Sequence, residues 1–182
     1  MEFRATAIAD VVLIEPRIFT DARGFFMETW QERQFAAAGI AARFVQDNHS
    51  RSVRGTLRGL HYQVQQPQGK LVRVVTGTVY DVVVDLRRSS ATFGRWYGTV
   101  LSESNHHMLW VPPGMAHGML VLSEQADFLY RCTDFYAPQY ERSVRWDDPE
   151  LGIGWPLAAG ELPLLSAKDA SAPLFAAAEY FP

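Results

Sequence analysis

Leu71-Val-Arg-Val-Val-Thr-Gly77-Thr-Val-Tyr-Asp-Val-Val-Val-Asp-Leu86 is the stretch that decides the fold class of this chain of 182 residues. It contains two valine-rich segments, 71–76 and 79–86, with Gly77 between them. β-Branched residues favour strands, and a glycine between two such segments favours a turn. The stretch therefore predicts two consecutive β-strands.

Short segments of the same character recur along the rest of the chain. Turn residues such as Gly24, Gly94 and the Pro112-Pro-Gly114 run separate many of them. Many short strands without helical patterns between them indicate an all-β sandwich, barrel or jelly roll. The further strands that we expect are 11–14, 25–30, 43–48, 95–101, 107–111, 119–122 and 128–134.

Helices contribute little to the expected fold. One short helix is predicted at 31–38, where Gly39 supplies the C-terminal stop. The tail from Asp147 onward is predicted to be irregular, with a small helix near 176–179. No repeat of fixed period is found, which argues against solenoids and propellers. The length and the 48% hydrophobic content predict a single domain over residues 1–182.

Net charge and cysteine content limit the classes of function. The formal net charge is −3, so no overall basic field attracts nucleic acid or an anionic membrane. The single cysteine, Cys132, cannot form an intrachain disulfide and is expected to be a buried, inert thiol. No apolar segment approaches the length of a membrane span or resembles a signal peptide, so we expect a cytoplasmic protein.

Titratable residues concentrate between Arg58 and Arg73, among residues that otherwise resemble core. Strict strand alternation would place Arg58 and His61 on opposite faces. A shared cavity therefore requires a kink or bulge, and Gly59 is the position for it. Considered alone, His61 could equally be a hydrogen-bonded histidine of the core or of the surface.

A second histidine, His117, follows the rigid turn at Pro112-Pro-Gly114 and has small neighbours. Two histidines in a small β-barrel invite a metal hypothesis, since cupin metal sites use His-x-His, a carboxylate and a later histidine. The His-x-His pattern is absent, because Tyr62 and Gln63 follow His61. His61 and His117 alone are too few ligands, so no metal is expected.

Tyr130 is the third candidate. It alternates with its neighbours so that it shares a face with Phe128 and Cys132, the predicted barrel interior. It is either a packed core tyrosine with a satisfied hydroxyl or a functional group. A histidine, a lysine, several arginines and a tyrosine together suit proton transfer.

Six ordered motifs extend over roughly the whole chain. They are Phe19-Thr-Asp-Ala-Arg-Gly-Phe-Phe26, Gln46-Asp-Asn-His-Ser50, Leu57-Arg-Gly-Leu-His-Tyr-Gln63, Gln68-Gly-Lys-Leu-Val-Arg73, Pro112-Pro-Gly-Met-Ala-His-Gly118 and Leu164-Leu-Ser-Ala-Lys-Asp169. In this order they resemble the dTDP-4-dehydrorhamnose 3,5-epimerase family, a stronger signal than any lone motif. The resemblance implies a cupin-type double-stranded β-helix (jelly-roll barrel) with a few short helices, a homodimer, a dTDP-4-keto-6-deoxyhexose substrate and no metal or redox cofactor.

The resemblance also implies roles for residues that match the family's motifs. His61 matches the general base, and Asp169 matches the carboxylate that orients its imidazole. Tyr130 matches the general acid, and Lys70 matches a cation beside the C4 oxygen, where negative charge grows. The positions that match residues holding the nucleotide sugar are Arg23, Glu28, Gln46, Asn48, Arg58, Lys70, His117, Glu141 and Lys168.

Arg23 is the best suited of these to a diphosphate, because a guanidinium donates bidentate, charge-assisted hydrogen bonds. In the family the N-terminal region crosses to the partner subunit, so we expect sites shared across the dimer. The favoured interpretation is epimerisation at C3 and C5 of dTDP-4-dehydro-6-deoxy-D-glucose to dTDP-4-dehydro-L-rhamnose through an enolate. A single-centre epimerase, a metal-dependent cupin and a non-catalytic nucleotide-sugar-binding cupin remain as alternatives.

Overall fold

Antiparallel β-sheet is the main regular structure of the protein in a computed structural model, which describes residues 1–158 and 160–182. The strands are β1 (Glu2–Ala5), β2 (Val12–Glu15), β3 (Ile18–Asp21), β4 (Gly24–Met27), β5 (Gln46–Val53), β6 (Leu57–Gln63), β7 (Lys70–Thr76), β8 (Thr78–Asp85), β9 (Trp96–Ser102), β10 (Met108–Val111), β11 (Met115–Val121), β12 (Gln125–Cys132) and β13 (Glu141–Ser143). The helices are α1 (Glu32–Ala37), α2 (Ala167–Ala170) and the 3₁₀ turns η1 (Pro138–Tyr140) and η2 (Phe175–Ala177).

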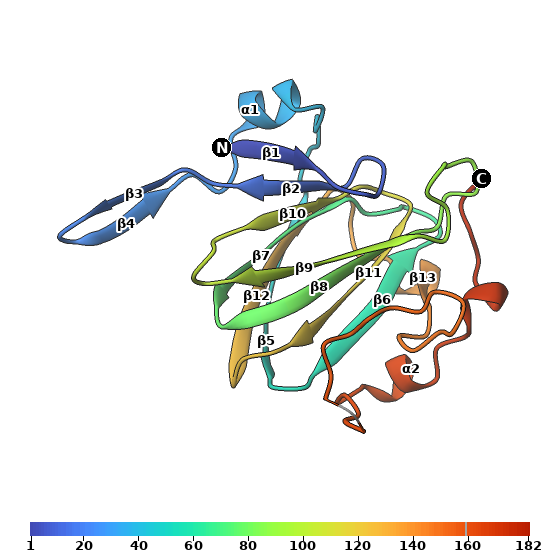
Figure 1. Cartoon of the computed structure of the whole chain (residues 1–182). Helices are drawn as coiled ribbons and strands as arrows, with labels where there is room; N and C mark the ends of the chain where they lie inside the picture. The colour runs from blue at the N-terminus through green and yellow to red at the C-terminus, as the bar shows by residue number, and fades with distance from the viewer. Residues whose placement is uncertain (159) are drawn as a thin grey trace.

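Two sheets form the body of the molecule (Figure 1). The first sheet has the strand order β1-β2-β10-β7-β12-β5, and the second has the order β13-β6-β11-β8-β9. A separate hairpin pairs β3 with β4. This arrangement confirms the predicted all-β class and its jelly-roll architecture.

Most predicted elements are present, with shifted ends. The helix expected at 31–38 is α1, and the Gln31 side chain caps it by accepting a hydrogen bond from the Gln34 backbone nitrogen at 2.7 Å. The strand expected at 43–48 is wrong at its start, because β5 begins at Gln46. The small helix expected at 176–179 is the 3₁₀ turn η2, and α2 was not predicted. The unpredicted strands are β1, β3 and β13, whereas β6 is the strand that the alternation argument required around Arg58 and His61.

The valine-rich stretch lies at the centre because β8 is covered on both faces. Val79 and Val83 pack between the two sheets with Val72 of β7. Val82 and Val84 pack with residues of the C-terminal tail, among them Leu151 and Phe175. A strand buried on both faces has a nearly continuous apolar sequence instead of a strict alternation.

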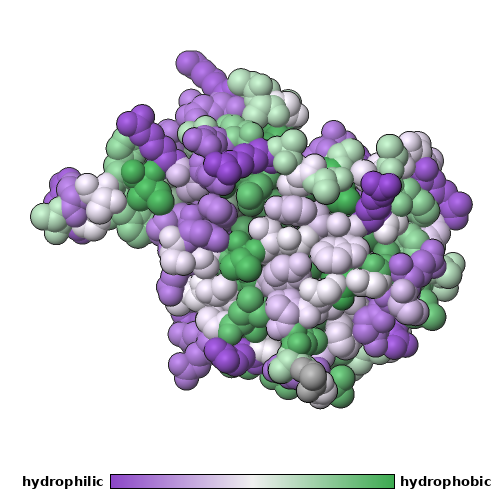
Figure 2. Space-filling view, viewed as in Figure 1, coloured by the Kyte–Doolittle hydropathy of each residue, from purple (hydrophilic) through white to green (hydrophobic). Residues whose placement is uncertain are grey.

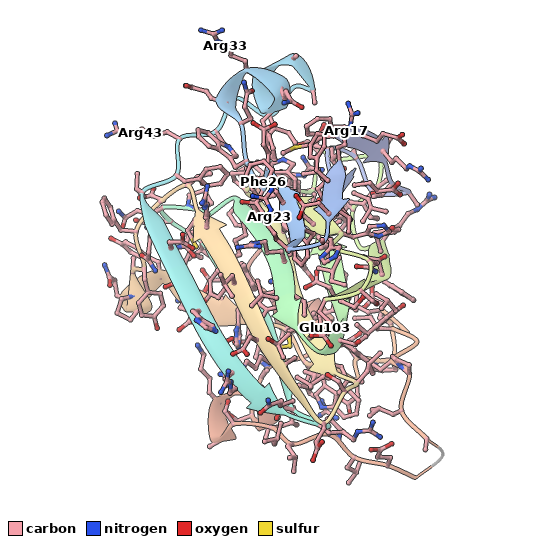
Figure 3. The ribbon with its side chains drawn as sticks, turned by 90° about the vertical axis from the view of Figure 1, so that its left-hand side faces the viewer. Arg17, Arg23, Phe26, Arg33, Arg43 and Glu103 are labelled. Atoms are coloured by element: carbon pink, nitrogen blue, oxygen red, sulfur yellow. The ribbon has the colours of Figure 1, made fainter. Side chains whose placement is uncertain are left out.

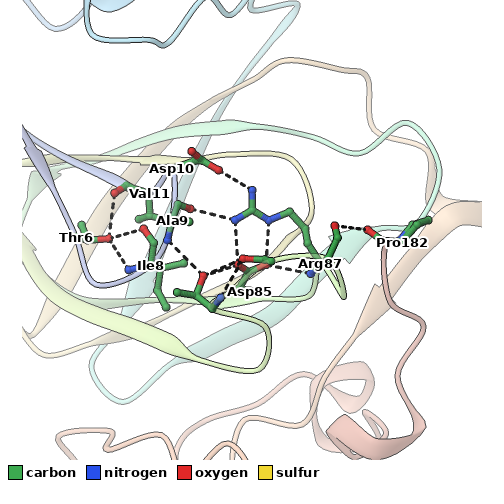
Figure 4. Close-up of polar contacts among 11 residues, drawn as sticks. Thr6, Ile8, Ala9, Asp10, Val11, Asp85, Arg87 and Pro182 are labelled. Carbon is green, nitrogen blue, oxygen red and sulfur yellow. Dashed lines mark hydrogen bonds and ion pairs between the residues drawn. The ribbon is translucent and has the colours of Figure 1, made fainter.

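A cluster of polar contacts ties the N-terminal loop to the end of β8 (Figure 4). Asp85 is fully buried and accepts hydrogen bonds from Arg87 Nε at 3.0 Å and Arg87 Nη2 at 2.9 Å. The hydroxyls of Ser90 and Thr92 also donate to Asp85, at 2.6 Å and 2.7 Å. Arg87 in turn contacts Asp10 at 2.8 Å. The buried carboxylate is thereby fully satisfied.

The β3–β4 hairpin projects away from the body as an arm (Figures 1 and 2). Its large aromatic side chains are exposed, with Phe25 at 58% and Phe26 at 66%. Exposed aromatic clusters on a folded chain mark interaction surfaces. Within the described residues, no helix is long and apolar enough to span a membrane.

Candidate active site

Strand β6 carries Arg58 and His61, and both side chains line one cavity. In the pairing of β6 with β11, Met119 lies opposite Arg58 and His117 lies opposite His61. Three residue steps on β6 thus match two on β11, which is a β-bulge. Gly59 has φ +130°, and a Cβ there would lie 2.5 Å from the Gly118 Cα, so this position requires glycine. The predicted bulge is confirmed.

The cavity lies between the two sheets and encloses about 60 Å³. Sites that enclose whole small-molecule ligands measure several hundred Å³, so this cavity can hold only part of a nucleotide sugar. Five of the predicted site residues line it, and Arg58 also donates from Nε to the Ser52 hydroxyl at 3.0 Å. The complete lining is Ser50, Arg58, His61, Lys70, His117, Gly118, Met119, Phe128 and Tyr130.

His61 is held by the C-terminal tail. Its Nε2 lies 2.5 Å from Oδ1 of Asp169, which is 3% exposed. The Asp169 backbone nitrogen donates to the Ser166 hydroxyl at the start of α2, at 3.1 Å. Burial opposes ionisation of Asp169, but the hydrogen bonds from His61 and Ser166 outweigh it and lower the pKa of the carboxyl group. Asp169 is therefore an anion that orients the imidazole.

Lys70 and Tyr130 come from neighbouring strands of the other sheet. Burial lowers the pKa of Lys70, which Cys132, Glu141 and Asp81 partly counteract. The Lys70 side chain is only partly exposed to solvent, because protein surrounds most of it. Burial raises the pKa of Tyr130, so its hydroxyl keeps its proton at neutral pH. The predicted interior position of Tyr130 is confirmed.

His117 belongs to a second carboxylate–imidazole pair. Its Nε2 lies 3.0 Å and 2.9 Å from the two carboxylate oxygens of Asp81, which is fully buried on β8. The His117 ring stacks on Phe128 with ring centroids 6.1 Å apart. Burial raises the pKa of Asp81, and His117 and Lys70 oppose that rise. Asp81 escaped prediction because a lone acid in a valine-rich strand carries no motif.

Polar residues beside the cavity form a connected group. Lys168 forms an ion pair with Glu141, which also accepts a hydrogen bond from the Tyr136 hydroxyl at 2.8 Å. The Tyr136 backbone nitrogen donates to Gln46 Oε1 at 2.8 Å. Gln46 Nε2 donates to Asn48 Oδ1 at 3.0 Å. Four predicted residues are thus joined through Tyr136, which was not predicted and is 53% exposed.

Arg23 and Glu28 are not brought to this chain's own cavity. Arg23 lies on the hairpin, has an 89% exposed side chain and pairs with Asp21 at 2.5 Å (Figure 3). Glu28 is exposed and accepts a hydrogen bond from Gln34 at 3.3 Å. In the part of the chain that the structure describes, no three His, Cys, Asp or Glu residues gather as a metal site.

Comparison with known proteins gives consistent results. The family model described as dTDP-4-dehydrorhamnose 3,5-epimerase matches residues 5–177. A dTDP-4-dehydrorhamnose 3,5-epimerase from Pseudomonas aeruginosa is 57% identical over 183 residues, covering 100% of both chains. A dTDP-6-deoxy-D-glucose-3,5-epimerase from Legionella pneumophila, solved in complex with dTDP-4-keto-L-rhamnose, superposes with a TM-score of 0.94 at 51% identity, covering 98% of this chain and 94% of that one.

A related structure with a narrower description also matches. It is a 3′-monoepimerase from Streptomyces bikiniensis in complex with dTDP-quinovose, with a TM-score of 0.87 and 36% identity over 94% of this chain and 86% of that one. These similarities extend over nearly the whole length of each protein and confirm the cupin-type fold that the motifs implied. The chain belongs to the dTDP-4-dehydrorhamnose 3,5-epimerase family.

Proposed function

We propose that this chain epimerises dTDP-4-dehydro-6-deoxy-D-glucose at C3 and C5 to dTDP-4-dehydro-L-rhamnose, with His61 as base and Tyr130 as acid. One observation carries the assignment of these two roles. His61 projects into the cavity from β6 of the second sheet, and Tyr130 from β12 of the first. A sugar ring between the sheets would meet base and acid on opposite faces, which is what inversion of a carbon centre requires.

Proton abstraction falls to the free nitrogen of His61. Because Nε2 contacts Asp169, Nδ1 is the atom left to take a proton from carbon. The C4 ketone acidifies the protons on C3 and C5, since the resulting carbanion is delocalised as an enolate. The Asp169 carboxylate stabilises the imidazolium that forms, and Tyr130 then delivers a proton to the opposite face of the same carbon.

The enolate oxygen needs a fixed positive charge. Lys70 and His117 line the same cavity, and the buried Asp81 carboxylate holds His117 in place. Positive groups that are already oriented before reaction stabilise developing charge without reorganisation. This supports a role for Lys70 at the C4 oxygen, with His117 and Arg58 binding the sugar around it.

The nucleotide part of the substrate would lie outside the small cavity. Gln46, Asn48, Glu141 and Lys168 are assigned to it because they form the polar group beside the cavity. Arg23 of the hairpin and Glu28 just after it would come from a second copy, which accounts for the exposed aromatic side chains of the hairpin. We therefore infer a homodimer with sites shared between subunits.

Proton NMR of the keto sugar nucleotide in D₂O, with and without EDTA, tests the function. Deuterium at both C3 and C5, unaffected by EDTA, is the expected result. Exchange at one carbon only would favour a single-centre epimerase, the activity described for the Streptomyces bikiniensis relative at 36% identity. Loss of exchange with EDTA would indicate a metal-dependent reaction, and no exchange at all would leave a binding role.

A further inference from the structure

The inner face of β5 carries a row of four polar side chains at alternate positions, Gln46, Asn48, Ser50 and Ser52. Three of them have partners within the protein. Gln46 bonds to Asn48, Asn48 Nδ2 contacts Cys132 Sγ at 3.6 Å, and Ser52 accepts a hydrogen bond from Arg58. Ser50 is the exception among the described residues.

The Ser50 hydroxyl is buried and has no hydrogen-bond partner among the residues that the structure describes. It lines the reaction cavity and lies directly across from Phe128 in the pairing of β5 with β12. A buried hydroxyl without a partner costs free energy, whereas an alanine of nearly the same size would cost none. A polar group that enters the cavity would satisfy it.

We propose that Ser50 is a sugar-binding residue that hydrogen-bonds a secondary ring hydroxyl of the substrate. The inference rests on the proposed function, because the ligand is the keto sugar that function requires. In a 4-keto-6-deoxyhexose linked through C1 to a diphosphate, only C2 and C3 carry hydroxyls. Lys70 is committed to the C4 oxygen, and Phe128 and Met119 beside Ser50 offer no polar atom except the methionine sulfur. Ser50 therefore recognises the hydroxylated edge of the ring.

Calorimetric titration of a Ser50→Ala variant tests this role. Both variant and reference carry His61→Asn, so that the keto sugar nucleotide binds without being converted. Loss of one neutral hydrogen bond should weaken binding of the sugar nucleotide about 3- to 10-fold. Affinity for dTDP alone should stay the same, because dTDP lacks the hexose whose ring hydroxyl Ser50 would contact. A 2-deoxy substrate then separates the two hydroxyls: it binds both proteins equally if Ser50 contacts the C2 hydroxyl, and remains sensitive if the contact is at C3.

Ser143→Ala is the matched control. Among the residues that the structure describes, Ser143 carries the other buried hydroxyl without a partner, lies across from His61 in the sheet pairing and does not line the cavity. Both variants should keep or gain thermal stability, and only Ser50→Ala should change the ratio of the two affinities. The proposal is overturned if Ser50→Ala leaves sugar-nucleotide binding unchanged, weakens dTDP equally, or behaves like Ser143→Ala. Absence of deuterium exchange by the unmodified protein in D₂O would instead refute the proposed function.

Discussion

His61 Nε2 and Asp169 Oδ1 lie 2.5 Å apart although 108 positions separate the two residues in the chain. The contact joins the centre of the β6–β11 sheet to α2 in the C-terminal tail. The C-terminal tail thus supplies the carboxylate that orients the proposed base, although the backbone of the tail is largely irregular. Removing the carboxylate should therefore affect chemistry more than folding.

We expect Asp169→Asn to lower kcat by about 10²- to 10³-fold, because the imidazolium loses its counter-charge and the ring its fixed tautomer. Stopped assays and proton exchange in D₂O measure the effect. His61→Asn should abolish exchange at both carbons and serves as the lower limit. Full exchange in His61→Asn would remove His61 from the mechanism, and an Asp169→Asn enzyme as fast as the wild type would show that the pair is only structural.

Tyr130→Phe should separate the two proton transfers. His61 can still remove and return a proton on its own face, so deuterium should enter from D₂O without net inversion. Epimerisation should fall by about 10²-fold or more, in line with the usual contribution of a general acid. NMR that follows exchange and inversion in the same sample measures both. Undiminished inversion would exclude Tyr130 as the acid.

The alkaline limit of activity should belong to Lys70. Burial lowers the pKa of Lys70 below its ordinary 10.5 and raises that of Tyr130 above its ordinary 10.0, so the lysine loses its proton first as pH rises. A neutral Lys70 cannot stabilise the enolate, and kcat should fall with a midpoint below 10.5. The same midpoint should persist in the residual exchange of Tyr130→Phe. If the alkaline midpoint is absent in Tyr130→Phe, the loss of activity at high pH belongs to Tyr130 and not to Lys70.

Mixed dimers should test whether sites are shared. Arg23→Ala and His61→Asn should each be inactive or nearly so as pure proteins. If Arg23 serves the partner's cavity, a mixed dimer keeps one intact site, and equal mixing should restore about a quarter of wild-type activity. Refolding or subunit exchange followed by an activity assay provides the measurement. Absence of any recovery, with mixed dimers verified by tag pull-down, would contradict shared sites.

Asp85→Asn should destabilise the protein by about 3 kcal/mol at neutral pH, because Arg87 would lose a buried anionic partner. Burial raises the pKa of Asp85, but the hydrogen bonds from Arg87, Ser90 and Thr92 outweigh this and lower it. The stabilisation is thus present above the ordinary value of 3.8 and is lost as pH falls through the lower folded value. The difference in free energy of unfolding between Asp85→Asn and the wild type should therefore shrink as the pH falls.

Asp10→Asn is the matched control for this pair, since Asp10 contacts the same Arg87 but is 68% exposed. An exposed partner should contribute less than about 1 kcal/mol. Urea unfolding of both variants at neutral and acidic pH gives the comparison. Equal losses in the two variants would show that burial of Asp85 is not the source of the effect.

The sequence alone predicted the all-β class and the bulge at Gly59 from local patterns, and the family resemblance of its motifs implied the jelly roll. Valine-rich strands separated by turns specify sheet, and two site residues three positions apart on one strand cannot share a face without an extra residue. The motifs around His61 also carried the family resemblance. These signals depend on residues close together in the chain.

Only the tertiary structure decided which distant groups meet. Asp81 is one acid in a valine-rich strand, and its contact with His117 depends on the register of β8 against β11. Ser50 stands in a quoted motif, yet its unpaired hydroxyl is visible only when the packing around it is known. Arg23 matched a substrate-binding position, but the fold places it on an exposed arm. Contacts between remote strands depend on sheet register and packing, and no local sequence pattern encodes either of these directly.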